Sequence, residues 1–350
     1  MRVLFVTRKY PPKIGGMESL SYALTNGFAK PKTIIALGRS QAHLVWFLPY
    51  VIVRVALSAY RYDVVHLGDA LLSSAGFLPR LFGKPVAVSV HGLDLTYTPW
   101  IYQRYLSLFL RADAFIANSE STKRLAEERG LSPVQAIAIG VPDRYFHVSR
   151  AANRDAELER RRAGRVVLVT VGRLRRRKGA VWFVRNVLPQ LSGALYVVIG
   201  VGVDHEEISS AAVDAGVSDA VWLTGSVSDA RLLDLLGSSD VFVMPNIAVS
   251  GDIEGFGIVA IEAAASGLPV VASRLEGIPD AVSDGNNGEL VSPEDASAYV
   301  SVLSALIADP EERERRGTRG RAYTGQNNAW PRIIEQYAAL FRGLLRRQRP

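Results

Sequence analysis

The chain has 350 residues, of which 48% are hydrophobic and 21% are charged. This composition excludes a disordered chain, and the length favours two globular domains over one. Cysteine is absent, which excludes disulfides and thiolate chemistry. The N-terminus runs directly into a strand-like segment, residues 2–7, so we expect no secretory leader.

The net charge of +7 is unevenly distributed along the chain. Residues 1–150 contain 18 Lys or Arg and 9 Asp or Glu, whereas residues 151–350 contain 23 and 25, which gives balances of +9 and −2. The basic first half favours an anionic partner there, either a membrane surface, an anionic acceptor or nucleic acid. The alternative is a surface charge that only keeps the protein in solution.

The first half alternates short apolar runs of strand type with longer runs of helical type. This alternation predicts a parallel sheet with helices on both faces. The predicted strands are residues 2–7, 33–37, 63–67, 85–90 and 114–117. The predicted helices are residues 17–28, 44–59, 70–82, 102–111 and 121–129.

A glycine pair, Gly15 and Gly16, opens the first predicted helix after a loop that contains two prolines. Glycines let the backbone N–H groups of a helix start approach a diphosphate closely. The loop is long and lacks the Gly-x-Gly-x-x-Gly pattern of dinucleotide sites, so a plain tight turn is the alternative.

The longest apolar run, Leu44–Ala59, is interrupted by Pro49 and Arg54. It is too short and too interrupted to predict a membrane span. Its aromatic residues and neighbouring arginines favour a helix that lies in a membrane interface. A helix packed only on the sheet is a nearly equal alternative.

His91 directly follows the predicted strand at residues 85–90. The carboxyl end of a parallel strand is where ligand sites form in α/β proteins. His91 is therefore a candidate contact for a sugar oxygen, with a structural histidine as the alternative.

The alternation restarts after a charge-dense segment, residues 151–165, which we interpret as a solvated linker or exposed helix. The predicted fold is α/β, with two doubly wound, Rossmann-like domains facing across a cleft. The predicted domains are residues 1–150 and 166–329, followed by a helix at 330–350. The predicted strands of the second domain are residues 166–171, 195–199, 220–223, 240–244, 269–272 and 288–291.

A basic turn, Gly172–Gly179, follows the first strand of the second domain. Arg173 and Lys178 flank this turn and are candidates to neutralise a diphosphate, Arg as a fork and Lys as a point charge. We expect residues 175–177 to be solvated. Further along, the backbone groups near Val227 follow another strand and are candidates to contact a nucleotide base, with a tight turn as the alternative.

The segment Ser250–Glu262 carries most of the chemical information in the chain. Gly255 and Gly257 flank a predicted helix start, whose unpaired N–H groups and dipole favour a phosphate. Glu254 lies just before this start and Glu262 just over one turn into the helix. A carboxylate on each side of a phosphate seat can hold a sugar on one side and a ribose on the other.

The sequence resembles the retaining GT-B glycosyltransferases of family four over nearly its whole length. The residues that carry the resemblance are Glu254 and Glu262 within Glu-Gly-Phe-Gly-Ile-Val-Ala-Ile-Glu, followed by Gly-Leu-Pro-Val-Val-Ala-Ser at 267–273. Further matches are Gly172-Arg173-Leu174 with Lys178-Gly179, and Gly15-Gly16-Met17-Glu18. The segment at 250–253 is similar to bacterial mannosyltransferases that build phosphatidylinositol mannosides.

The resemblance implies a role for each matching residue. Gly15 and Gly16 would contact the donor diphosphate, Arg173 and Lys178 would balance the leaving diphosphate, and His91 would lie beside the transferred sugar. Glu254 and the backbone of Phe256, Gly257 and Ile258 would hold the hexose and phosphate. Glu262 would bind the ribose, the basic domain would hold the acceptor, and the last helix would cross back onto that domain.

The function implied is metal-independent transfer of a hexose, with retention, from a nucleotide-diphosphate sugar to a cell-envelope lipid or growing glycan. Fixed cations and a helix start can stabilise charge on the leaving diphosphate without a metal or a bound cofactor. The donor base is either guanine or uracil, and no oligomeric state is predicted. The expected location is the cytoplasm, either free or peripheral on the inner face of the cell membrane.

Two rival functions remain from these residues. One is another enzyme on a similar fold, either a sugar-nucleotide epimerase or a glycogen-synthase-like polymerase, and the other is a non-catalytic nucleotide- or RNA-binding protein that uses the basic turn. Nucleic acid is not expected as a partner, because the basic turn is predicted to lie beside the acidic segment at 252–254, which repels phosphates.

Overall fold

A computed structural model describes residues 1–12, 16–28, 31–38, 41–149 and 152–347 of the chain. They form two compact units. Unit 1 consists of Met1–Gly140 together with Trp330–Pro350, and unit 2 consists of Val141–Ala329. Unit 2 is therefore inserted into the sequence of unit 1.

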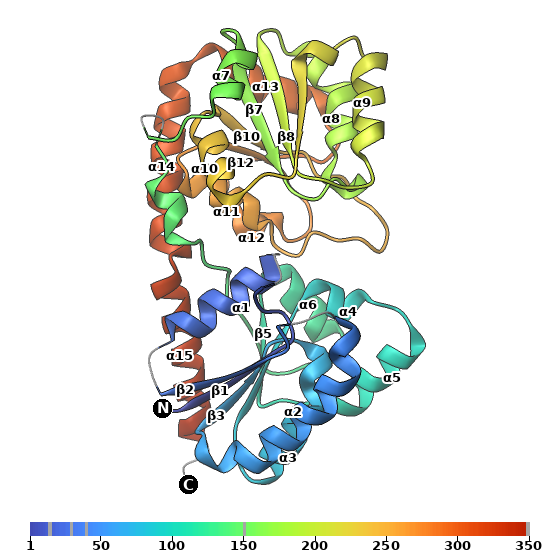
Figure 1. Cartoon of the computed structure of the whole chain (residues 1–350), viewed down its shortest axis with the longest axis vertical. Helices are drawn as coiled ribbons and strands as arrows, with labels where there is room; N and C mark the ends of the chain where they lie inside the picture. The colour runs from blue at the N-terminus through green and yellow to red at the C-terminus, as the bar shows by residue number, and fades with distance from the viewer. Residues whose placement is uncertain (13–15, 29–30, 39–40, 150–151, 348–350) are drawn as a thin grey trace. The chain divides into compact units, whose positions relative to one another are not determined.

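Unit 1 is built on a parallel six-stranded sheet in the order β2-β1-β3-β4-β5-β6 (Figure 1). Its strands are β1 Val3–Thr7, β2 Lys32–Ala36, β3 Val64–Leu67, β4 Val86–Val90, β5 Ala114–Ala117 and β6 Val134–Ala136. Its helices are α1 Gly16–Gly27, α2 Leu44–Ser58, α3 Phe77–Leu81, α4 Gly92–Thr96, α5 Trp100–Phe109, α6 Glu120–Glu128 and α15 Trp330–Arg347, with 3-10 turns η1 Gln41–His43, η2 Ala59–Arg61 and η3 Ala70–Gly76.

Two apolar cores hold this sheet between its helices. One core contains Phe5 of β1 and Phe341 of α15, so the last helix of the chain completes unit 1. The other core contains Phe47, Val51 and Val55 of α2. Because both faces of the sheet are covered, its strands are apolar runs, as in other parallel sheets.

Unit 2 repeats this plan with the strand order β12-β11-β10-β7-β8-β9, again in parallel. Its strands are β7 Val166–Val171, β8 Ala194–Ile199, β9 Val221–Gly225, β10 Val241–Met244, β11 Val270–Ser273 and β12 Glu289–Val291. Its helices are α7 Ala156–Arg162, α8 Ala180–Asn186, α9 His205–Asp214, α10 Asp229–Gly237, α11 Ile258–Ala265, α12 Ile278–Ala281, α13 Ala296–Ala308 and α14 Pro310–Asn328, with 3-10 turns η4 Asp143–His147, η5 Arg176–Lys178, η6 Leu188–Gln190 and η7 Ser218–Ala220.

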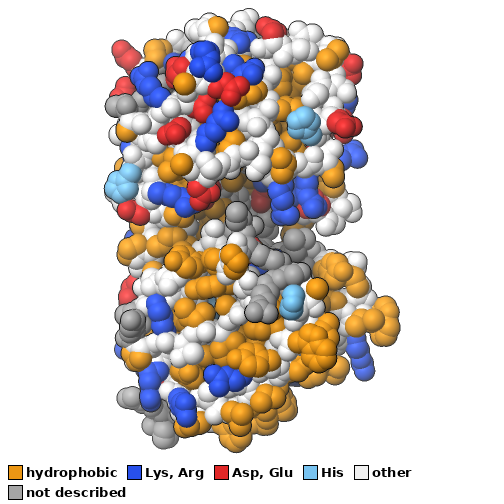
Figure 2. Space-filling model, viewed as in Figure 1, with side chains coloured by type: hydrophobic (Ala, Val, Ile, Leu, Met, Phe, Trp, Pro, Cys, Tyr) orange, Lys and Arg blue, Asp and Glu red, His pale blue; other side chains and the backbone are white. Residues whose placement is uncertain are grey.

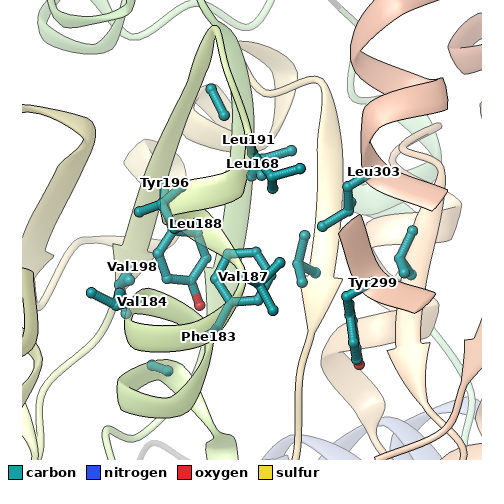
Figure 3. Close-up of a cluster of buried hydrophobic side chains, with 14 of the residues drawn as sticks. Leu168, Phe183, Val184, Val187, Leu188, Leu191, Tyr196, Val198, Tyr299 and Leu303 are labelled. Carbon is teal, nitrogen blue, oxygen red and sulfur yellow. The ribbon is translucent and has the colours of Figure 1, made fainter. Parts of the chain in front are cut away.

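Aromatic rings from helices and strands meet in the core of unit 2 (Figure 3). The rings of Phe183 and Tyr196 lie with their centroids 4.6 Å apart. Buried hydroxyls in this core are paired: that of Tyr299 lies 2.9 Å from Ser273 Oγ and that of Tyr196 lies 2.8 Å from Thr170 Oγ1. The core therefore carries polar atoms without leaving these ones unsatisfied.

The structure corrects the prediction for the segment that joins the two predicted domains. The predicted boundary at residue 150 falls inside unit 2, which begins at Val141. Residues 151–165 include α7, whose Leu158 is fully buried and whose Arg162 forms an ion pair with Asp240. Leu158 and the ion pair of Arg162 dock this helix onto unit 2, so the interpretation as a solvated linker was wrong for α7, whereas a helix was the stated alternative.

Other elements differ from those predicted, among them the short helix α4, which was not expected. The helix expected at residues 70–82 is divided into η3 and α3. Strand β6 was not predicted, because its three residues, Val-Gln-Ala, are too short and too polar to form a recognisable apolar run.

The strand order places one topological switch point in each sheet. In unit 1 it lies between β1 and β3, because β2 lies on one side of β1 and β3 on the other. In unit 2 it lies between β10 and β7, because β8 and β9 lie on one side of β7 and β10 on the other. Ligands in open α/β sheets bind outside the carboxyl ends of the strands at such points. The loops that follow β1, β3, β7 and β10 are therefore where a site is expected.

Candidate functional site

Unit 2 brings the loops after β7 and β10 together at its switch point. The backbone N–H of Ile247, in the loop after β10, donates to the carbonyl oxygen of Arg177, in the loop after β7, at 3.0 Å. Gly179 has a positive φ of 68°, and a Cβ placed there would lie 1.8 Å from the carbonyl oxygen of Pro245. Only glycine allows this approach, which fixes the basic turn against the acidic loop.

Glu254 is the centre of a compact ion cluster. The guanidinium of Arg177 and the ammonium of Lys178 both bind its Oε2, and Asn246 Nδ2 donates to the same oxygen at 3.2 Å. Arg177 also binds Asp252 Oδ1 through Nε at 3.0 Å. These side chains are mostly buried, so their charges are poorly screened by solvent.

The pKa values in the cluster follow from burial and pairing. Burial alone would raise the pKa of Glu254, but the positive charges of Lys178 and Arg177 hold it below its ordinary value. Burial lowers the pKa of Lys178, Glu254 opposes this, and the nearby charges of Arg177 and Arg173 add to the lowering. The carboxylate is thus kept ionised, and a third cation, the exposed Arg173, stands close to the pair.

The backbone of the acidic loop is held from a third loop, after β11. A carboxylate oxygen of Glu276 accepts the backbone N–H of Glu254, and Gly277 N donates to the Glu254 carbonyl oxygen at 3.1 Å. Glu276 itself has a positive φ of 52°. Three loops therefore fix the position of one carboxylate, which is the preorganisation that a catalytic or binding group needs.

Among the residues that the structure describes, no side chain caps the N-terminus of α11. Gly257 is its N-cap, in the left-handed conformation at φ 92° and ψ 46°, and its glycine backbone presents no side-chain oxygen to the first N–H groups. The side chain of Phe256 is buried, so only its backbone can contact a ligand. Ile258 begins the helix. These features fit a phosphate at the helix start.

Glu262 lies in α11 beside a cluster from η4 and α10. Burial raises the pKa of Glu262 to about 7, whereas a hydrogen bond with Tyr145 and the charge of Arg144 act to lower it. Arg144 forms an ion pair with Asp229 at 3.0 Å, and its guanidinium lies 5.3 Å from the centroid of the Tyr145 ring. Val227 lies two residues before Asp229, in the loop that precedes α10. The structure thus brings this loop close to Glu262.

Unit 1 has a polar cluster of its own at its switch point. Arg8, after β1, binds Asp69, after β3, at 2.8 Å and lies 3.8 Å from Asp94. His91, after β4, places Nε2 3.2 Å from the Gly68 carbonyl oxygen, and its backbone N–H donates to Asp94 at 3.2 Å. A carbonyl oxygen only accepts, so Nε2 of His91 donates this hydrogen bond.

The predicted site residues divide between the two units. Gly16 is the first residue of α1 and His91 follows β4, both in unit 1, whereas Gly15 lies outside the described residues. The other predicted residues lie in unit 2, where Lys178 and Glu254 are in direct contact. The cleft between the units, and with it any contact of Gly16 or His91 with the donor, stays a prediction.

Sequence reasoning missed four residues of the site. Arg177 was expected to be solvated, and this was wrong, because its side chain is 11% exposed and binds two carboxylates. Glu276, Arg144 and Tyr145 were not considered. No local pattern marks them, since their partners Glu254 and Glu262 lie more than 20 residues away along the chain.

The arrangement can bind a nucleoside diphosphate that carries a sugar. The start of α11 can accept phosphate oxygens, and the carboxylates of Glu262 and Glu254 can accept hydrogen bonds from hydroxyl groups, so their roles toward a ribose and a sugar stay predictions. Arg173 and Lys178 can balance charge that develops on a leaving diphosphate.

Both halves of the chain match families of glycosyltransferases. Residues 153–323 match the family described as glycosyl transferases group 1, and residues 1–145 match glycosyltransferase family 4.

Curated relatives carry glycosyltransferase names. A D-inositol 3-phosphate glycosyltransferase from Thermobifida fusca is 30% identical over 315 residues, which cover 81% of this chain and 70% of that protein. A GDP-mannose-dependent alpha-(1-6)-phosphatidylinositol monomannoside mannosyltransferase from Mycolicibacterium smegmatis is 28% identical, covering 97% of this chain and 98% of the relative.

Solved structures show the same fold. Anabaena HepE in complex with UDP superposes with a TM-score of 0.78 at 18% identity, covering 98% of this chain and 100% of that chain. A sucrose-phosphate synthase from Thermosynechococcus elongatus superposes with a TM-score of 0.72 at 21% identity, covering 98% of each chain. The fold is therefore GT-B.

Proposed function

This chain belongs to the group 1 glycosyltransferases and uses a nucleotide-sugar donor, and we propose that it transfers a mannose- or glucose-type hexose to a lipid-linked or glycan acceptor of the cell envelope. The observation that carries the proposal is the pairing of Glu254 with Lys178 and Arg177 at the uncapped start of α11. This geometry provides a carboxylate for sugar hydroxyls directly beside a seat for phosphate.

The donor is a nucleoside diphosphate linked to a hexose. Relatives named as mannosyltransferases depend on GDP-mannose, and a structural neighbour was solved with UDP-glucose. Both donors share a diphosphate and a ribose, which are the groups that we propose α11 and Glu262 bind. We propose GDP-mannose and a UDP-sugar as the two donors to test first.

The reaction proceeds with retention and without a metal. Support for the absence of a metal comes from three neighbouring cations, Lys178, Arg177 and Arg173, whose positive charges exceed the two carboxylates, Glu254 and Asp252, that Lys178 and Arg177 bind. Departure of the diphosphate leaves negative charge on its oxygens, and fixed cations and helix N–H groups stabilise that charge. The leaving phosphate accepts the acceptor hydroxyl proton as the new glycosidic bond forms on the same face of the sugar.

The proposed place of the reaction is the cytoplasm, with the enzyme held at the inner face of the cell membrane. The relatives named as phosphatidylinositol monomannoside mannosyltransferases act on a lipid, which supports a lipid-linked acceptor. The positive charge of the first half of the chain supports an anionic partner for that half, either a membrane surface or an acceptor.

Donor selection is tested by thermal denaturation of the purified full chain with UDP, GDP and their hexose conjugates, since a bound ligand raises the melting temperature. The favoured donor is then incubated, labelled in the hexose, with detergent-dispersed bacterial lipids. Label in the lipid phase supports the proposal, and full activity in EDTA supports metal independence. Stabilisation by no nucleotide, or inversion at the anomeric carbon of the product, would contradict it.

A further inference from the structure

Helix α2 has two apolar stripes, and only one of them is covered by the core. Phe47, Val51 and Val55 form the buried stripe. The outward stripe consists of Trp46, Tyr50, Val53 and Leu57, all of them exposed, and Trp46 is 78% exposed. Their spacing of four, three and four residues places them on one face of the helix.

The exposed apolar surface continues onto two neighbouring helices of unit 1. Helix α3 contacts α2, and α5 contacts η3, which packs on α2. Figure 2 shows hydrophobic side chains gathered over this part of unit 1. We define the three-helix face as these exposed side chains of α2, α3 and α5: Val45, Trp46, Tyr50, Val53, Leu57, Phe77, Leu81, Trp100, Ile101, Leu108 and Phe109.

The charged side chains of the three helices are all positive, and that of Arg80 is already paired with Asp113 at 3.3 Å. The sequences of α2, α3 and α5 contain no Asp or Glu, whereas each contains an arginine: Arg54, Arg80 and Arg104. Arg54 and Arg104 are exposed, and the exposed Arg61, just after α2, donates to the Tyr60 hydroxyl at 2.8 Å. A large apolar patch on a monomer marks an interaction site, and the arginines select an anionic partner.

We propose that the three-helix face docks unit 1 onto an anionic lipid bilayer, with its aromatic side chains at headgroup level. Trp and Tyr are the residues that favour the membrane interface, and arginines beside them pair with lipid phosphates. An interface between two copies of this face would bring its arginines together without an acidic residue from α2, α3 or α5 to pair them. The bilayer is therefore the favoured occupant. This proposal rests on the lipid-linked acceptor of the proposed function.

The contact is peripheral rather than transmembrane. Helix α2 and the turn after it, Leu44–Arg61, are long and apolar enough for a span by length and composition alone. Crossing the bilayer would remove Phe47, Val51 and Val55 from the core that they share with the sheet. A helix that keeps one stripe in the core and offers the other lies in the interface.

The test uses the full chain with vesicles of phosphatidylcholine alone or mixed with phosphatidylglycerol. We expect the chain to co-sediment with the mixed vesicles at low salt, and its tryptophan emission to shift to shorter wavelength, since Trp46 and Trp100 are exposed in solution. The triple variant Trp46→Ser, Tyr50→Ser and Leu57→Ser should lose binding by about tenfold for each side chain.

Two further variants separate the contributions. Val201→Ser, Val203→Ser and Val213→Ser remove three exposed apolar side chains from unit 2 and should leave vesicle binding unchanged. Arg54→Gln, Arg61→Gln and Arg104→Gln should weaken binding to the mixed vesicles by about fivefold for each charge. Circular dichroism confirms that each variant keeps its fold.

Three outcomes would overturn the proposal. The first is failure of the wild-type chain to bind mixed vesicles at low salt. The second is a loss of vesicle binding in the valine variant as large as that in the triple variant. The third is a wild-type chain that binds no vesicles but forms a concentration-dependent dimer, which the triple variant does not form. Transfer to detergent-dispersed acceptor needs no bilayer, so its persistence in the triple variant separates a failure of docking from a failure of the proposed function.

Discussion

Arg177 and Glu254 form an ion pair in which both side chains are almost buried, at 11% and 13% exposed. They come from the loops after β7 and β10, the two strands at the switch point of unit 2. The two residues are 77 positions apart along the chain, and they meet because β7 and β10 are neighbours in the sheet. The pair is therefore a direct consequence of the strand order.

Glu254→Gln should lower the rate of transfer by about 100-fold or more, because the sugar loses an ionised acceptor at the reacting centre. Leaving Lys178 without its partner, and Arg177 with Asp252 alone, should also reduce the free energy of unfolding by about 3 kcal/mol. Labelled transfer and denaturant unfolding measure the two effects. Wild-type transfer in this variant would remove Glu254 from the reaction.

Arg177→Ala should reduce transfer strongly, because Asp252 and Glu254 both lose a cation and the acidic loop loses its anchor. Arg175→Ala is the matched control, since Arg175 lies two residues earlier in the same turn and is exposed. We expect the control to keep near-wild-type kcat. Equal kinetic effects of the two substitutions would show that only the total charge of the turn matters.

Glu262 should make stability depend on pH between its unfolded and folded pKa values. Burial raises the folded pKa of Glu262 to about 7 from the ordinary 4.5, so its favourable contribution is complete below 4.5 and is lost as pH rises through 7. The loss is about 3 kcal/mol from the shift alone. Melting temperatures at about pH 5 and about pH 7.5, which bracket most of this window, should therefore differ more in the wild type than in Glu262→Gln.

Nucleoside diphosphate binding should show the opposite pH dependence, because ribose hydroxyls donate best to the ionised Glu262. Affinity should rise from pH 6 to pH 8, and Glu262→Gln should flatten the rise. Titration calorimetry with UDP or GDP measures it. A rise of the same size in the glutamine variant would assign the titration to another group.

Gly179→Ala should destabilise unit 2 by well over 1 kcal/mol, because the new Cβ would meet the Pro245 carbonyl oxygen at 1.8 Å in a left-handed backbone. Gly216→Ala is the control: Gly216 has nearly the same φ, +67°, but no atom within 4 Å of the added Cβ. The control should cost about 1 kcal/mol from the backbone alone. Denaturant unfolding compares the two variants.

The fold was largely predictable because the strands of a parallel sheet that is covered on both faces are continuous apolar runs in the sequence. The sequence located eleven of these runs, and each corresponds to a strand of the structure. Edge strand β6 is short and half-exposed, so its residues carry no such signal. Helix α7 was misread because its charges dominate its composition, although one leucine and its ion pairs dock it.

The candidate site was predictable only where residues next to a helix start carry the chemistry. Glu254, Gly257 and Glu262 lie within nine residues, so one segment shows their relation to a phosphate seat. Arg177 and Tyr145 acquire their roles through partners brought close by the fold. Whether a charged side chain in a basic run is solvated or buried depends on that packing, and composition does not record it.

The insertion of unit 2 into the sequence of unit 1 separates the order of synthesis from the order of folding. Unit 2 is complete once residue 329 has been made, whereas the core around Phe5 still lacks Tyr337, Phe341 and Leu344 of α15. Domains generally fold in the order in which the ribosome releases them. Here the N-terminal sheet is released first, yet one of its faces is covered only in part, by Leu24 and Phe28, until the final helix arrives, so the second half of the molecule is expected to be native before the first.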